Sequence, residues 1–142
     1  MKTSKEVISS ILKTTQMGQL GIRSVEKYAA DPELKSVLNS QLQEYDRIET
    51  QAHAIAQQRG WRVQELNPAV RKTAEIVAHS RLAGKKKDPK IAAMMVNGNT
   101  RGFVKGIKNL HHYPQQDEKI AALAQQLIDC EKSNVRQIER FL

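Results

Sequence analysis

Apolar side chains recur along the chain with the three- and four-residue spacing that places them on one face of a helix. In the first such segment this face is formed by Ile8, Ile11, Thr15, Gly18, Ile22, Val25 and Ala29, most of them apolar. Each long segment would span roughly 36–42 Å at 1.5 Å per residue. The pattern predicts an all-α protein with four long helices and one short one, at about residues 4–30, 32–59, 68–83, 89–112 and 116–141.

Capping residues and prolines mark the ends of these segments. Thr3 to Glu6 has the form of a capping box, in which the two side chains satisfy free backbone N–H groups. Proline is tolerated in the first turn of a helix, after a capping side chain, and helices tend to stop at glycine or just before proline. The predicted starts are Asp31-Pro32, Asn67-Pro68 and Asp88-Pro89, and the predicted stops are Gly60, Gly84 and Tyr113-Pro114.

The lengths of the connections predict how the helices are ordered. The first two helices are joined by a very short turn, and so are the last two, whereas residues 60–88 form a long connection that contains the short helix. We therefore expect residues 1–142 to form a single domain, an antiparallel four-helix bundle of two hairpins with a short extra helix in the long crossover. This is the ferritin-like topology.

The amino-acid composition indicates the cellular compartment in which the protein is expected. The chain has one cysteine, Cys130, so it cannot form an internal disulfide, which suits a reducing environment. It has no run of about 18 apolar residues, and Lys5, Glu6 and Lys13 interrupt the apolar residues near the N-terminus. We expect a cytoplasmic protein without a transmembrane segment.

Three short motifs resemble the ferritin-like superfamily, and in particular small bacterial members that lack the di-iron ligands. They are Gln16-Met17-Gly18 in the first helix, residues 94–102 with their paired glycines in the penultimate helix, and a last helix with Glu131 and Asn134 that closes on Phe141-Leu142. The resemblance covers nearly the whole chain. It implies the bundle fold and no particular activity.

A di-iron centre in this superfamily needs a glutamate from each of two helices and a Glu-x-x-His motif from each of the other two. Here Glu44 is followed by Arg47, and Glu131 by Asn134, so neither motif keeps its histidine. The first and penultimate helices have no acid near their middle. The sequence therefore predicts a non-catalytic interaction or structural protein, without metal or cofactor, which we expect to be a homodimer.

Polar residues at mid-bundle height allow a further hypothesis. A small molecule or a single metal ion would bind in a polar pocket lined by Gln16, Tyr45, Asn99, Glu131 and Asn134. Two acid–histidine pairs with i,i+4 spacing, Glu49/His53 and Glu75/His79, are alternative partial metal sites, although ordinary surface pairing explains them as well.

Glycine recurs every four residues in the penultimate helix, at 98, 102 and 106. Each glycine costs about 1 kcal/mol of helix stability relative to alanine, so the stripe needs a compensating role. Gly18, Gly98, Gly102 and Gly106 are expected to allow close helix packing, inside the bundle or across a dimer. The alternative is a cavity where side chains are missing.

The net charge of +8 is concentrated in one stretch, because residues 81–113 contain eight basic residues and a single acid. A solvated face is one explanation, and a site for an anion is the other. That site would bind an acidic partner, an anionic membrane surface or, less favoured because aromatic residues are scarce, nucleic acid. Within segment 81–108 its residues would be Lys85, Lys86, Lys87, Arg101, Lys105 and Lys108.

Overall fold

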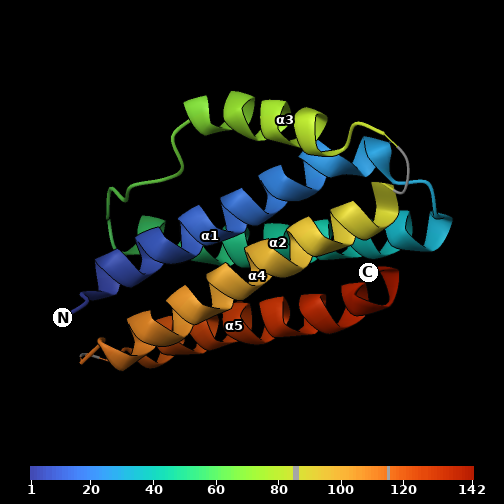
Figure 1. The fold of residues 1–142 in the computed structure, drawn as a ribbon. Coiled ribbons are helices and arrows are strands. Elements are labelled where there is room, and N and C mark those ends of the chain that lie inside the picture. Colours follow the sequence, from blue (N-terminus) through green and yellow to red (C-terminus); the bar gives the residue numbers. More distant parts are fainter. Residues whose placement is uncertain (85–86, 115) are drawn as a thin grey trace.

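The computed structural model describes residues 1–84, 87–114 and 116–142, and these residues form helices and no strand. The elements are α1 (Ser4–Val25), η1 (Glu26–Tyr28), α2 (Pro32–Gln58), α3 (Ala69–Arg81), α4 (Lys87–His111), α5 (Glu118–Ile138) and η2 (Glu139–Phe141) (Figure 1). The prediction of an all-helical protein is confirmed. The first and last predicted helices each end in a short 3-10 turn, so their α-helical parts are shorter than expected.

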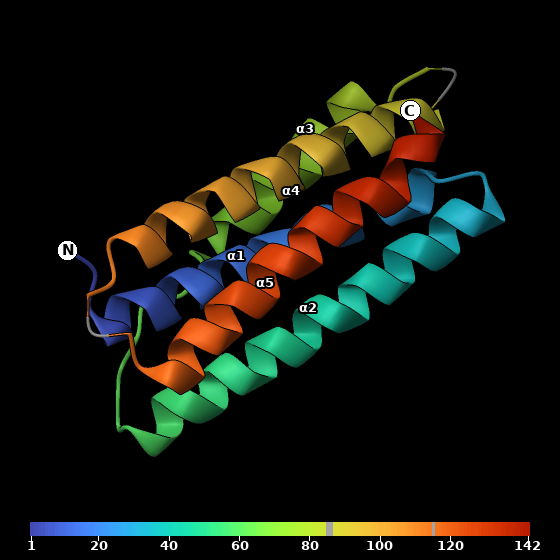
Figure 2. The same cartoon turned by 90° about the horizontal axis from the view of Figure 1, so that it is seen from below.

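The four long helices lie alongside one another (Figures 1 and 2). α1 packs on α2, α4 packs on α5, and each of these pairs also contacts the other. The residues between them form one hydrophobic cluster, which includes Leu12, Leu38, Ile48 and Ile120, all fully buried. Because each helix is apolar on one face only, burial of these faces stabilises the fold.

Most predicted helix ends are found where the sequence placed them. The Thr3 side chain accepts a hydrogen bond from the backbone N–H of Glu6, and Asp31 accepts one from Glu33. Asn67 does the same for Ala69. Gly60 and Gly84 have φ angles of 66° and 105°, a backbone region that side chains disfavour, so glycine is suited to both stops.

The expected cap at Asp88 is wrong. α4 begins at Lys87, and the Asp88 carboxylate accepts hydrogen bonds from the backbone N–H groups of Ala30 and Asp31, at 2.8 and 2.9 Å. Asp88 therefore joins the start of α4 to the turn between α1 and α2. The sequence predicted that Asp88 caps its own helix. In the fold, its carboxylate instead accepts hydrogen bonds from the backbone of the distant turn between α1 and α2.

α3 lies outside the four long helices, against α1 (Figure 1), and behind α1 and α4 when the molecule is seen from below (Figure 2). Ala78 is its only buried residue, and Ile76 is 69% exposed. The segment before it is attached to α1, because Ser9 donates a hydrogen bond to the carbonyl of Gln64 and Gln16 accepts one from the N–H of Leu66. Within the described residues, no helix is both long enough and apolar enough to cross a membrane.

Candidate functional site

A cluster of buried polar side chains lies in the middle of the bundle. It joins Tyr45 of α2, Asn99 of α4, and Glu131 and Asn134 of α5. The Tyr45 hydroxyl lies 2.7 Å from Asn99 Oδ1 and 2.9 Å from Glu131 Oε2. Asn134 Nδ2 donates to Asn99 Oδ1 over 3.0 Å. Four of the five residues expected in a mid-bundle polar pocket are thus brought together.

Gln16, the fifth, does not belong to this cluster. Its side chain donates to Glu49 and Glu65 and accepts from the backbone of Leu66, on the side of α1 that faces the crossover. The core-facing residue at this height is Thr15, which is fully buried. Successive residues of a helix are turned by about 100°, so a shift of one position moves Gln16 out of the core.

Glu131 is only 2% exposed, and among the described residues it is the only buried carboxylate. Burial raises the pKa of this carboxyl to about 8, although the hydrogen bond with Tyr45 lowers it. At neutral pH Glu131 is therefore mostly protonated, so it can donate to the Tyr45 oxygen while Tyr45 donates to Asn99. Oε1 of Glu131 then remains as a buried acceptor that has no partner among the described residues.

Glycines of α1 and α4 lie directly against this cluster. A Cβ atom added to Gly18 would lie 2.4 Å from the Tyr45 ring, and one added to Gly102 would lie 2.2 Å from Glu131 Oε2. A Cβ on Gly106 would lie 2.8 Å from Ile128. These three glycines therefore allow close approach inside the bundle, as one of the two interpretations of the stripe predicted. Gly98 differs, because a Cβ there would meet nothing within 4 Å.

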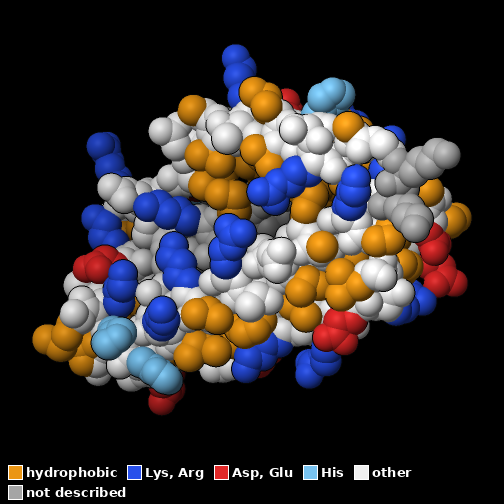
Figure 3. Space-filling model, viewed as in Figure 1, with side chains coloured by type: hydrophobic (Ala, Val, Ile, Leu, Met, Phe, Trp, Pro, Cys, Tyr) orange, Lys and Arg blue, Asp and Glu red, His pale blue; other side chains and the backbone are white. Residues whose placement is uncertain are grey.

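The space beside Gly98 is a groove of about 550 Å³ between α1, α3 and α4. The buried polar cluster contributes to its floor, where Tyr45, Asn99 and Glu131 line it. Its walls are largely apolar and contain glycines, and its side chains include Met17, Met94, Met95, Val77 and Leu66. In Figure 3, apolar side chains lie beneath α3, and the surface is hollowed between α3 and α4. A groove of this size and lining is typical of small-molecule sites.

Four bases line the same groove: Lys13 of α1, Arg81 of α3, and Arg101 and Lys105 of α4. Lys and Arg side chains gather around the hollow in Figure 3. None of the four forms an ion pair with a described residue. With Glu131 protonated, the charged side chains that line the groove are all positive.

Of the six basic residues that the sequence suggested for an anion site, four lie in the described part of the chain, and the structure places only two of these at the groove. Arg101 and Lys105 line the groove. Lys108 is exposed but does not line it, and the Lys87 ammonium lies 5.5 Å from the Tyr28 ring centre. Lys85 and Lys86 lie outside the described residues.

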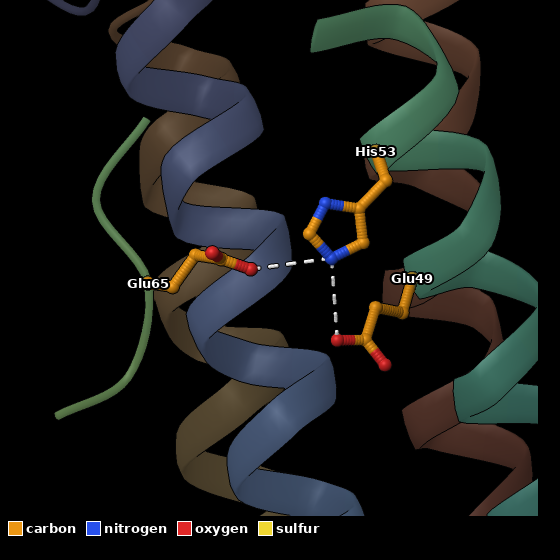
Figure 4. Close-up of side chains that lie close together, drawn as sticks. All are labelled: Glu49, His53 and Glu65. Carbon is orange, nitrogen blue, oxygen red and sulfur yellow. Dashed lines mark ion pairs between the residues drawn. The ribbon is translucent and has the colours of Figure 1, made fainter. Parts of the chain in front are cut away.

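A second cluster lies on the opposite side of α1, where Glu49 and His53 of α2 meet Glu65 of the crossover (Figure 4). His53 Nε2 lies 3.5 Å from Glu49 Oε2 and 3.2 Å from Glu65 Oε1. The Gln16 amide donates to both carboxylates, and Gln19 donates to Glu49. Burial raises the pKa of Glu49, but hydrogen bonds from Gln19 and Gln16 and the nearby His53 lower it below its ordinary value overall. These contacts attach the crossover to α1 and α2 without needing a cation.

The other metal candidates are separated or redirected. His79 shares a hydrogen bond of 3.1 Å with the Tyr28 hydroxyl, so it is not committed to Glu75. Glu44 forms an exposed ion pair with Arg47. All four histidines are exposed, and Glu131 is a single buried carboxylate. The residues in the middle of the bundle therefore do not fit a di-iron centre, which needs several carboxylates and histidines.

Several groove residues were missed by sequence reasoning, among them Lys13, Met17 and Gly21 of α1. The spacing of Lys13, Met17 and Gly21, four residues apart, places them on one helical face and is the signal that indicates their shared location. No protein-family model, curated protein or solved structure matches the chain.

Proposed function

We propose that this protein is a non-enzymatic binding protein that holds a small molecule in the groove between α1, α3 and α4. One observation carries the proposal: Glu131, a buried carboxyl with an oxygen that has no hydrogen-bond partner among the described residues, lines the floor of the groove. Buried polar atoms are normally hydrogen-bonded, and an orphan acceptor costs about 1–3 kcal/mol. A ligand that donates to Oε1 would remove this cost.

The glycines support the same function. Gly18 and Gly102 separate Tyr45 and Glu131 from the groove by backbone alone, because a side chain at either position would overlap them. Gly98 lowers helix stability with no packing contact to compensate, and it lines the groove. A ligand in the groove would give this glycine a role.

We also propose that the long helices have the ferritin-like order, as two antiparallel hairpins. The packing of α1 on α2 and of α4 on α5, with α3 in the connection between the two pairs, supports this arrangement. The bundle would then be a scaffold whose mid-height polar residues hold a ligand in place of two metal ions.

The groove can be tested with a neutral probe, Nile red, whose fluorescence rises in apolar surroundings. Gly98→Leu places a side chain into the groove at a position with no close neighbour, so we expect the variant to fold and to lose most of the Nile red signal. Val104→Leu is the matched control, because Val104 is 40% exposed on the same helix and does not line the groove. Equal fluorescence from both variants and the wild type would reject the groove as a binding site.

A polyanion site is a second candidate, because the bases of α1, α3 and α4 gather on one face of the molecule (Figure 3). Binding to single-stranded DNA, RNA or anionic vesicles should then weaken steeply as salt rises, since counterions are released from the polyanion. Titrations at 50 and 200 mM salt test this candidate. If no salt-sensitive binding occurs to any of the three, the candidate fails.

A further inference from the structure

We infer that the ligand of the groove is an amphipathic carboxylate whose acid group lies among the rim bases and which also donates a hydrogen bond to Glu131. This inference rests on the proposed function and specifies its ligand class. It combines three features of the described residues: the sign of the charges that line the groove, the apolar character of its walls, and the unpartnered acceptor on its floor.

The charge pattern selects an anion. Lys13, Arg81, Arg101 and Lys105 come from three helices, and no carboxylate of a described residue forms an ion pair with any of them. A cationic ligand would be repelled by these bases, and a neutral one would gain nothing from their positive potential. Arginine also binds a carboxylate through two parallel hydrogen bonds, which favours a planar acid group.

The walls select an apolar body. Met17, Met94 and Met95 line the groove together with glycines, and methionine adapts its flexible side chain to ligands of irregular shape. An inorganic anion or a sugar phosphate would leave these apolar side chains uncovered. The ligand therefore combines an acid group with a hydrocarbon portion.

The floor selects a hydrogen-bond donor. Asn99 Oδ1 already accepts hydrogen bonds from Tyr45 and Asn134, so it cannot accept another from a ligand. Glu131 Oε1 is the remaining acceptor of the cluster, and it lies beside Gly102, which has no side chain and also lines the groove. A hydroxyl or amide N–H on the ligand would pair with it.

The head-group part is tested by calorimetry with ten-carbon probes below their micellar concentrations: decanoate, 1-decanol and decyltrimethylammonium. We expect decanoate to bind at least about tenfold more tightly than the other two at pH 7, a difference of roughly one charge-assisted contact. The double variant Arg101→Gln/Lys105→Gln should lose this preference. Lys90→Gln/Lys108→Gln is the matched control, because it removes the same charge from the same helix outside the groove.

The donor part is tested with 3-hydroxydecanoate and 10-hydroxydecanoate against decanoate. At least one hydroxylated chain should bind several-fold more tightly to the wild type. Glu131→Met should remove that preference, whereas Glu131→Gln should keep it, because the amide carbonyl replaces the acceptor. Circular dichroism of both variants checks that they are folded, and Glu131→Gln retains the hydrogen-bonding capacity of the core if Glu131→Met does not fold.

The outcomes separate this inference from the proposed function. If Nile red binds in a Gly98-dependent manner but the three head groups bind equally, the groove is a binding site and the anion assignment is wrong. If neither hydroxylated chain is preferred over decanoate, the donor assignment is wrong. If an oligonucleotide displaces decanoate at equal concentration, the rim serves a polyanion and the inference is overturned.

Discussion

The Glu131 carboxyl is easier to ionise in the unfolded chain than in the folded protein. Burial raises its pKa from an ordinary value of 4.5 to about 8, and the hydrogen bond that it shares with Tyr45 of α2 offsets this rise only in part. The other charged groups that line the same groove are bases, from α1, α3 and α4. The folded protein thus holds a proton that the unfolded chain releases once the pH exceeds 4.5.

This difference predicts that the free energy of unfolding decreases as the pH rises. Between pH 4.5 and 8 the folded state binds one more proton at this site than the unfolded state does, so its contribution is full below pH 4.5 and is lost as the pH approaches 8. The expected slope from this group alone is about 1.4 kcal/mol per pH unit. Urea unfolding at pH 5, 6, 7 and 8 measures it.

Glu131→Gln is the control for this pH dependence. The amide does not ionise, yet it can still donate to Tyr45 and keep a carbonyl oxygen, so the variant should show a flatter pH profile. Parallel profiles for the wild type and Glu131→Gln would mean that Glu131 is ionised in the folded protein.

On the scale of single elements, the glycines of α4 have opposite roles although they share one spacing pattern. Gly102 and Gly106 are packed against Glu131 and Ile128, whereas Gly98 faces open space. The pattern in the sequence is the same for each, because helical periodicity shows which residues share a face and does not show what lies opposite them.

We predict opposite effects of alanine at these positions. Gly102→Ala should lower the free energy of unfolding by about 1–3 kcal/mol, because its Cβ would overlap the buried carboxylate. Gly98→Ala should raise it by up to about 1 kcal/mol, through its better helix propensity. Urea unfolding of the two variants beside the wild type measures both, and destabilisation by Gly98→Ala would contradict the open surroundings of that glycine.

For the whole molecule, stability is uneven. The four long helices share one buried cluster, while α3 contributes a single buried residue and lies outside them. α3 is therefore expected to be the least stable of the helices that line the proposed site.

Hydrogen exchange should show this difference directly. We expect the backbone amides of α3 to exchange faster than those in the middle of α4 and α5, because few apolar contacts hold α3 in place. Saturation with decanoate should slow exchange in α3, since Arg81 and Val77 would contact the ligand. Mass spectrometry of proteolytic peptides measures both effects. Protection of α3 equal to that of α5 in the free protein would be inconsistent with this view.

The homodimer stays a prediction, but one of its arguments is weaker. Gly18, Gly102 and Gly106 face Tyr45, Glu131 and Ile128 of the same chain, so the close approach they allow is used inside the molecule. A dimer would need a different surface, and sedimentation equilibrium measures whether one forms.

The helices and most of their ends follow from the sequence alone. Apolar spacing, capping side chains and the glycine stops act over a few residues, and Thr3, Asp31, Gly60 and Gly84 occur where those local rules place them. The sequence also predicted the residues of the polar cluster that are now found together, Tyr45, Asn99, Glu131 and Asn134. Each is a polar residue on an otherwise apolar helix face.

Only the tertiary structure decided what these elements form together. It turned Gln16 away from the core, gave Asp88 to a distant turn, and placed α3 and Lys13 beside the glycines of α4. The path of a long crossover and the rotation of each helix about its axis depend on the simultaneous packing of all the helices. Local periodicity indicates which face of a helix is buried, but it does not show which neighbour lies opposite that face or how the crossover runs. The groove could therefore be identified only in the tertiary structure.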